Sequence, residues 1–156
     1  MLSNAYGGAP MTIGAASIAV HDKKGTIQTG SSRALTFSGR ATMTIPANAV
    51  VYSDPVDFAV PPMADLAIDL YLPGTTNTPA ALTMHAAALQ TNYVSETGNH
   101  VGAATLPAVA TIQNWFLLTG VQVVAPGVSG VIVAFGDSIT DGARSTPDTN
   151  SRWPEP

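Results

Sequence analysis

Short hydrophobic runs recur along the first 124 residues of the chain. The clearest run is residues 65–72, where one face carries Leu66, Ile68, Leu70 and Leu72 and the other carries Asp65, Asp69 and Tyr71. This period of two is typical of a half-buried antiparallel strand. Further runs of the same kind are residues 11–20, 41–45, 89–94 and 115–124.

Glycine and proline separate these runs, with 14 glycines and 12 prolines in the chain. Closely spaced short strands with turn residues between them indicate a mainly β fold, and we expect an antiparallel, jelly-roll-like β-sandwich. Helix signals are weak. Residues 79–89 are rich in alanine but lead into a strand-like run, so we expect a loop or one helical turn there.

The pattern changes after residues 125–127, which read Ala-Pro-Gly. Residues 131–135 are apolar on both faces, as in a parallel strand that is covered on both sides. An alternative is that these residues form the last strand of the sandwich. Pro154 suits the first turn of a helix. We therefore expect two parts, a β-sandwich over residues 1–127 and the beginning of an α/β domain over residues 128–156.

Composition and charge exclude several classes of function. The net charge is -4 and only six residues are Lys or Arg, too few to neutralise many phosphates, so we expect no nucleic-acid partner. No cysteine is present, which excludes disulfides and thiolate chemistry. No apolar run is long enough to span a bilayer, and the start of the chain lacks the basic and apolar regions of a signal peptide.

The strongest chemical motif follows the apolar run. It is Gly136-Asp137-Ser138-Ile139-Thr140-Asp141-Gly142. A serine at the carboxyl end of a strand can act as a nucleophile if a base reaches it, and nearby backbone N–H groups can stabilise an oxyanion. The alternative is that Asp137 and Ser138 cap a turn through their side chains.

This motif resembles the first conserved block of the GDSL (SGNH) serine hydrolases. The resemblance implies that Ser138 is the nucleophile, that its backbone N–H forms part of the oxyanion hole, and that Gly136, Asp137 and Thr140 support the motif. It implies hydrolysis of carboxylic esters, with acyl or acetyl esters such as acetylated carbohydrates as substrates, and no cofactor or metal. Two later stretches are also similar to this family, residues 146–148 and residues 152–154.

Four upstream segments are similar to the β-rich region that precedes the catalytic domain in one bacterial branch of the family. They are residues 2–7, 35–39, 53–56 and 89–93. The resemblance implies an accessory domain and an extracellular or periplasmic location for the full-length protein.

The family's other catalytic groups come from later sequence blocks, which supply a Gly, an Asn and an Asp-x-x-His. The eighteen residues after Ser138 contain no histidine. Because a serine without a base is a weak nucleophile, we expect the chain alone to be inactive and to pack against the remainder of a catalytic domain.

Other candidate sites are weaker. For His21, His85 and His100 a structural or solvated role is favoured over a role as base or metal ligand. Residues 137–148 fit a calcium loop poorly because Ile139 takes the third ligand position. Tyr52, Tyr71, Tyr93, Trp115 and Phe116 fit strand packing better than sugar stacking. The competing functional hypothesis is a non-catalytic β-sandwich that binds a carbohydrate or a protein partner.

Overall fold

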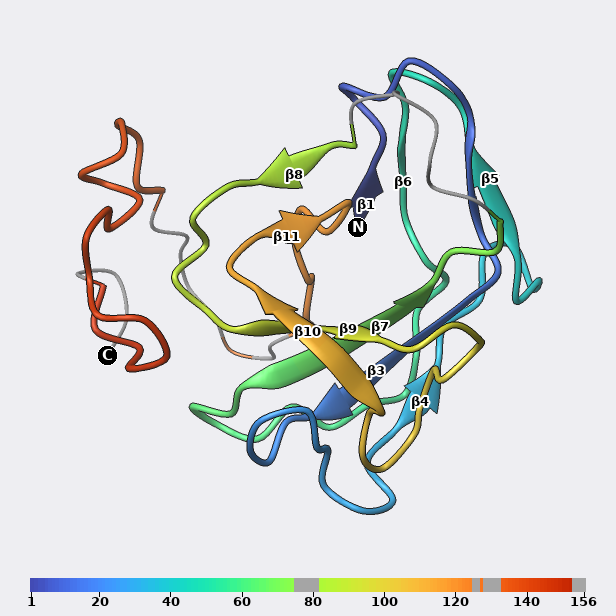
Figure 1. Ribbon diagram of the computed structural model, residues 1–156, viewed down its shortest axis with the longest axis horizontal. Coiled ribbons are helices and arrows are strands. Elements are labelled where there is room, and N and C mark those ends of the chain that lie inside the picture. The colour runs from blue at the N-terminus through green and yellow to red at the C-terminus, as the bar shows by residue number, and fades with distance from the viewer. Residues whose placement is uncertain (75–81, 125–126, 128–132, 153–156) are drawn as a thin grey trace.

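The structure, a computed structural model shown in Figure 1, describes residues 1–74, 82–124, 127 and 133–152. These residues form eleven short strands, arranged in small antiparallel sheets, and contain no helix. The prediction of a mainly β protein is therefore confirmed for the described part. Without a helix, none of the described residues forms a helical membrane span.

The largest sheet has the order β4–β3–β7 and consists of β4 (Arg33–Ala34), β3 (Ala15–Val20) and β7 (Leu66–Tyr71). Strands β3 and β7 pair in continuous register from Ala15 opposite Tyr71 to Val20 opposite Leu66. The predicted run 65–72 is therefore a strand. Its polar face is not simply solvated, because Asp69 accepts hydrogen bonds from Ser17 Oγ (3.1 Å) and from the backbone N–H of Gly102 (2.9 Å).

The predicted strand over residues 11–20 is divided in two at Gly14. Strand β2 (Met11–Ile13) pairs with β5 (Met43–Ile45), whereas β3 belongs to the central sheet. Gly14 lies between them and donates its N–H to the carbonyl of Tyr71 at 2.8 Å. One hydrophobic run thus serves two different sheets.

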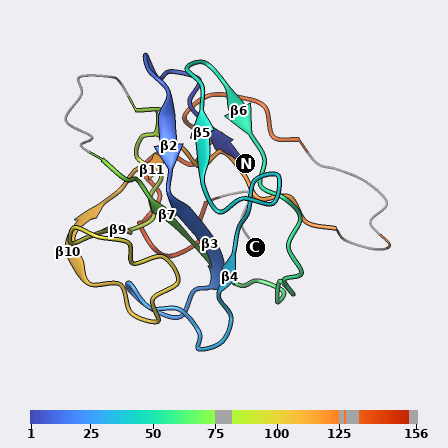
Figure 2. The same cartoon turned by 90° about the vertical axis from the view of Figure 1, so that its right-hand side faces the viewer.

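Three further antiparallel pairs complete the described strands. Strand β1 (Leu2–Ser3) pairs with β6 (Val50–Val51), β8 (Met84–His85) with β11 (Trp115–Phe116), and β9 (Asn92–Ser95) with β10 (Ala108–Ile112). The β9–β10 pair crosses one face of the central sheet, as the two perpendicular views in Figures 1 and 2 agree. The predicted strand 115–124 ends after two residues, because Leu117 takes a φ of 62°.

The hydrophobic core lies where β1, β2, β3 and β5 meet. It is made of the buried residues Leu2, Ile13, Ala16, Phe37, Ile45 and Leu117. The backbone turn at Leu117 therefore directs this side chain into the core, where it is 1% exposed. Burial of such a side chain stabilises the fold by about 1.5–3 kcal/mol, which offsets the strain of a left-handed backbone.

A carboxylate connects two of the segments that resemble the β-rich region. Asp54 accepts hydrogen bonds from Thr36 Oγ1 (2.7 Å) and from the N–H groups of Ser38 (2.9 Å) and Gly39 (2.7 Å). The bonds from Gly39 and Thr36 hold the pKa of Asp54 below its ordinary value of 3.8. The turn over residues 36–39 is thereby tied to the chain that follows β6.

Residues 133–152, which we call the C-terminal segment, run alongside the connection between β8 and β9 (Figure 1). The predicted strand 131–135 does not appear in its described part: residues 133–135 are in no strand, and residues 131 and 132 lie outside the described residues. Val133 is 79% and Phe135 98% exposed. These residues have no partner strand among the described ones. The predicted boundary at residues 125–128 falls outside the described residues except for Gly127, as does the predicted helix start at residues 153–154.

Candidate functional site around Ser138

The Ser138 motif forms a compact series of turns. Asp137 Oδ1 accepts a hydrogen bond from the N–H of Ile139 at 3.0 Å, and the Asp137 carbonyl accepts one from Asp141 at 3.0 Å. The carbonyl of Ser138 accepts a bond from the N–H of Ala143 at 2.8 Å. Asp137 therefore caps the turn through its side chain, which is the local role that aspartate often takes.

Ser138 itself is exposed on this turn. Among the described residues, no hydrogen bond involves its hydroxyl or its backbone N–H. Its side chain is open to an incoming molecule, and within the described part no histidine donates to it or accepts from it. The turn thus presents a serine without bringing a base to it.

Gly136 and Thr140 pack directly against one another. A Cβ atom at position 136 would overlap Thr140 Oγ1 and lie 2.8 Å from Thr140 Cβ. Only glycine leaves room for the threonine side chain here. The two motif residues therefore shape the turn through contact with each other.

Gly142 is needed for a second close approach. Its φ is +85°, and a Cβ atom there would lie 2.9 Å from Arg152 Cβ and 2.6 Å from Arg152 Cδ. Arg152 in turn donates to the carbonyl of Ala88 at 3.3 Å. The glycine thus lets the end of the C-terminal segment fold back over the Ser138 turn and reach the β-rich part.

We expect Gly142→Ala to release the C-terminal segment from the β-rich part. The change adds backbone strain and a steric overlap with Arg152, with a combined cost of about 2–4 kcal/mol. Gly30→Ala is the matched control, because Gly30 has a φ of +79° and nothing lies within 4 Å of its Cβ position. Limited proteolysis would compare the two variants, and equal cleavage rates within residues 133–152 would contradict the expectation.

The C-terminal segment is held to the β-rich part by Asp148. The two carboxylate oxygens of Asp148 accept bonds from the N–H and the hydroxyl of Thr91, both at 2.6 Å. The N–H of Asp148 also donates to the carbonyl of Leu89 at 3.0 Å. A carboxylate that accepts two bonds from one residue forms a short, directional clamp.

A second set of contacts surrounds Asn150. Its amide accepts a bond from Gln90 Nε2 at 2.7 Å and donates to Asp65 Oδ1 at 2.9 Å. Residues 146–152 therefore lie on residues 88–91, so the structure brings together two segments that resemble the same family.

The three histidines have different surroundings. His85 Nε2 lies 3.0 Å from Asp141 Oδ2, and its ring lies 5.8 Å from the ring of Trp115 at a tilt of 44°. His21 Nε2 lies 2.7 Å from the carbonyl of Lys24, and His100 follows a glycine turn. Sequence reasoning missed the contact between His85 and the Ser138 motif, because 56 residues separate its two members.

The Asp148 clamp is expected to open in acid. The bonds from Thr91, side chain first and backbone second, and the positive charge of His21 hold the pKa of Asp148 below its ordinary value of 3.8. A lowered carboxyl pKa means that the stabilisation is complete above pH 3.8 and is lost as the pH falls through the lower, folded-state pKa. The Thr91 amide resonance, followed by NMR during acidification, should shift below pH 3.8, and this shift should be absent in Asp148→Asn.

A groove of about 460 Å³ lies where the C-terminal segment meets the β-rich part. Its wall combines apolar and polar side chains, among them Leu66, Gln90, Trp115, Leu118, Asn150 and Arg152. Apolar side chains, amides and a guanidinium group thus line one open groove.

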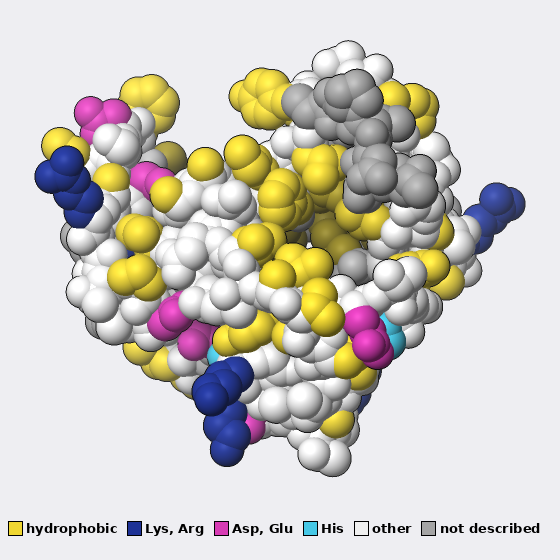
Figure 3. Space-filling view, in the orientation of Figure 1, with side chains coloured by type: hydrophobic (Ala, Val, Ile, Leu, Met, Phe, Trp, Pro, Cys, Tyr) yellow, Lys and Arg dark blue, Asp and Glu magenta, His cyan; other side chains and the backbone are white. Residues whose placement is uncertain are grey.

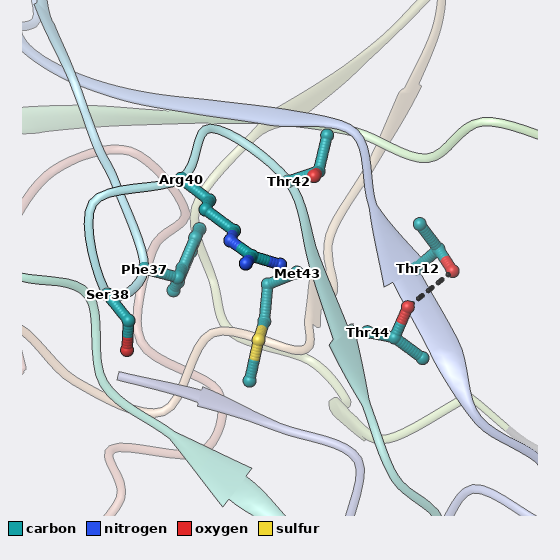
Figure 4. Close-up of a pocket in the computed structure, with 7 residues that line it drawn as sticks. All are labelled: Thr12, Phe37, Ser38, Arg40, Thr42, Met43 and Thr44. Atoms are coloured by element: carbon teal, nitrogen blue, oxygen red, sulfur yellow. Dashed lines mark hydrogen bonds between the residues drawn. The ribbon is translucent and has the colours of Figure 1, made fainter.

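A second hollow, of about 430 Å³, lies beside strands β2 and β5 (Figure 4). Its lining residues are Thr12, Phe37, Ser38, Arg40, Thr42, Met43 and Thr44. The hydroxyls of Thr12 and Thr44 are 3.1 Å apart, and the Arg40 side chain extends toward Met43. No residue of the Ser138 motif lines this hollow.

The face drawn in Figure 3 is mainly apolar and neutral. Hydrophobic side chains gather around a hollow in the upper half of the face in Figure 3, whereas Lys and Arg lie apart from one another there. In the described part of the chain, no three His, Asp or Glu side chains come close enough to hold a metal ion. The sequence matches no model of a known protein family and no curated protein.

Proposed function

We propose that the chain carries the nucleophile of a GDSL-type serine esterase. In this reaction Ser138 Oγ attacks the carbonyl carbon of a carboxylic ester, and the backbone N–H of Ser138 donates to the developing oxyanion. The alcohol leaves with a proton, and water then hydrolyses the acyl-enzyme. A histidine base, which the family's Asp-x-x-His would supply from further sequence, must take the serine proton.

The observation that carries the proposal is the Gly136–Thr140 motif together with the exposure of its serine. A nucleophile must be accessible and its hydroxyl must be available to a base. Ser138 is exposed and lies on a turn that Asp137, Gly136 and Thr140 shape through their own contacts. The turn-capping role of Asp137 is compatible with this function, since the cap leaves the serine side chain unoccupied.

Apolar exposure around the motif supports the proposal of a larger catalytic domain. Val133, Phe135 and Ile139 are 79%, 98% and 78% exposed. Soluble domains rarely leave several neighbouring large apolar side chains in water. We propose that residues 128–156 belong to an α/β domain whose remaining strands and helices cover these side chains.

Residues 1–127 are proposed to be the accessory domain, a jelly-roll-like β-sandwich. Support comes from the small antiparallel sheets and from the way β9–β10 crosses the face of the central sheet. Acyl or acetyl esters, acetylated carbohydrates among them, are the proposed substrates, and an extracellular or periplasmic site is the proposed location.

Labelling with a fluorophosphonate tests the proposal directly, because this reagent forms a stable bond only with an activated serine. The reagent is applied to the natural polypeptide encoded around this sequence, and the labelled peptide is identified by mass spectrometry. Modification of Ser138 would support the esterase function. Modification of another serine, or none at all, would exclude Ser138 as the nucleophile.

The groove around Trp115 favours a second candidate function, a module that binds a polysaccharide. Trp115 lines the same groove as Gln90 and Asn150, and an indole ring and amide groups suit the apolar faces and hydroxyls of a sugar. Affinity electrophoresis in gels that contain soluble polysaccharides would detect such binding. Retardation that Trp115→Ala removes would favour this function, whereas unretarded migration in every gel would reject it.

A further inference from the structure

The C-terminal segment contacts the β-rich part at several points after Ser138. The described contacts come from Asp141, Asp148, Asn150 and Arg152, and their partners are His85, Thr91, Gln90, Asp65 and the carbonyls of Ala88 and Leu89. Five of these six partners lie within residues 85–91. This stretch, which leads from β8 into β9, therefore serves as a docking strip.

The bond to His85 is the one nearest to the serine. Asp141 is three residues from Ser138, and its N–H donates to the carbonyl of Asp137 at 3.0 Å. Its carboxylate meets His85 Nε2 at 3.0 Å. His85 is held in turn by the pairing of β8 with β11, where it lies opposite Trp115. The Ser138 turn is thus connected to a strand pair of the β-rich part.

The Asp148 clamp holds the segment by more hydrogen bonds than the single contact between Asp141 and His85. Three hydrogen bonds of 2.6–3.0 Å join Asp148 to Thr91 and Leu89, and two of them reach a charged carboxylate. Hydrogen bonds to a charged group are strong in a protected site and weaker at a solvent-exposed one such as this. The clamp is therefore local and can be removed without removing the core.

We infer that the 85–91 strip positions the Ser138 turn, with His85 and Thr91 as positioning residues that act through Asp141 and Asp148. This role rests on the proposed esterase function. An accessory part that only bound substrate would not need hydrogen bonds to the segment that carries the nucleophile. A misplacement of about 1 Å can cost about 100-fold in rate. A clamp at Asp148, in the same segment as Ser138, therefore controls catalysis without touching substrate.

The first test compares Thr91→Val with Thr91→Ser. Valine keeps the shape of threonine but loses the hydroxyl that binds Asp148, whereas serine keeps the hydroxyl. Asp148→Ala removes both carboxylate bonds to Thr91 and keeps only the backbone bond to Leu89, and Asp57→Asn is a control at an exposed carboxylate outside the strip. Two quantities are measured: backbone order parameters of residues 133–152 by NMR on the 156-residue chain, and kcat and KM for an aryl acetate on the natural polypeptide that contains it.

We expect Asp148→Ala and Thr91→Val to lower the order parameters of residues 137–150 and to reduce kcat by about tenfold or more, while KM changes less than about twofold. Thr91→Ser and Asp57→Asn should match the wild type in both measurements. A loosened segment with unchanged kcat would overturn the positioning role, as would unchanged order parameters in Asp148→Ala.

The two proposals fail in different ways. If the wild-type polypeptide has no turnover and Ser138 is not labelled by a fluorophosphonate, the esterase function is wrong and the positioning role falls with it. If turnover is present but the clamp variants raise KM and leave kcat unchanged, the esterase function stands. The strip then serves substrate binding, and the inference is overturned.

Discussion

Under the proposed esterase function, Ser138→Ala is expected to lower kcat/KM for carboxylic esters by at least about 10⁴-fold in the natural polypeptide, because the proposed covalent intermediate can no longer form. The same change should leave the thermal midpoint of unfolding unaltered. Ser138 is exposed, and among the described residues its hydroxyl makes no hydrogen bond that the alanine variant would lose.

Ser145→Ala is the matched control for this substitution. Ser145 lies seven residues further along the same segment, and its backbone N–H, which the substitution keeps, donates to Gly142 at 3.0 Å. We expect this variant to retain full activity. Full activity in Ser138→Ala would contradict the esterase proposal. An equal loss of activity in both variants would show that the effect is not specific to Ser138. Rates with an aryl acetate, measured beside circular dichroism melts, separate these cases.

The largest loss of stability is expected for Gly7→Ala. A Cβ atom at this position would overlap Asn4 Oδ1 and lie 2.6 Å from Asn4 Cγ. The Asn4 side chain cannot move away easily. It is 1% exposed, and its amide nitrogen donates to the carbonyls of Ala9 (2.9 Å), Pro46 (3.1 Å) and Ile45 (3.2 Å).

The expected cost of Gly7→Ala is about 2–6 kcal/mol in the free energy of unfolding, the sum of an overpacking cost and the loss of one hydrogen bond. Overpacking contributes about 1–3 kcal/mol, and displaced hydrogen bonds leave buried carbonyls without donors at about 1–3 kcal/mol each. Asn4→Ala should cost a similar amount, because it removes the same three donations.

Gly8→Ala is a control from the neighbouring position, where nothing lies within 4 Å of the added Cβ. Its expected effect on the free energy of unfolding is within about 0.5 kcal/mol of zero, as for other exposed substitutions. Urea titrations of the wild type, Gly7→Ala, Gly8→Ala and Asn4→Ala would measure all four values. Similar midpoints for the two glycine variants would contradict the view that the buried Asn4 side chain cannot move away from an added Cβ.

Local pattern predicted part of the fold well. Residues 41–45 and 65–72 contain β5 and β7, since alternation over a half-buried strand is a local property. Strand β10 (Ala108–Ile112) was missed, because its residues alternate weakly and four of them are exposed. The pattern over residues 11–20 predicts one strand. Its division between two sheets depends on residues 43–45 and 66–71, which lie far along the chain.

The apolar run at residues 131–135 predicts a strand that the structure does not show at residues 133–135. Five apolar residues in sequence indicate a strand that is covered on both faces, and such a strand needs neighbours. The described residues offer it none, and Phe135 stays exposed in an irregular segment. A hydrophobic run specifies that burial is favourable, but pairing partners decide whether a strand forms.

The sequence by itself determined the local chemistry around Ser138. Asp137 caps its own turn and Gly136 makes room for Thr140 four residues later, because these contacts span only a few peptide units. Only the tertiary structure decided which distant groups meet this turn. His85 reaches Asp141 and Thr91 clamps Asp148 across 56 and 57 residues of sequence. No periodicity encodes such pairs, since they depend on how several strands pack together.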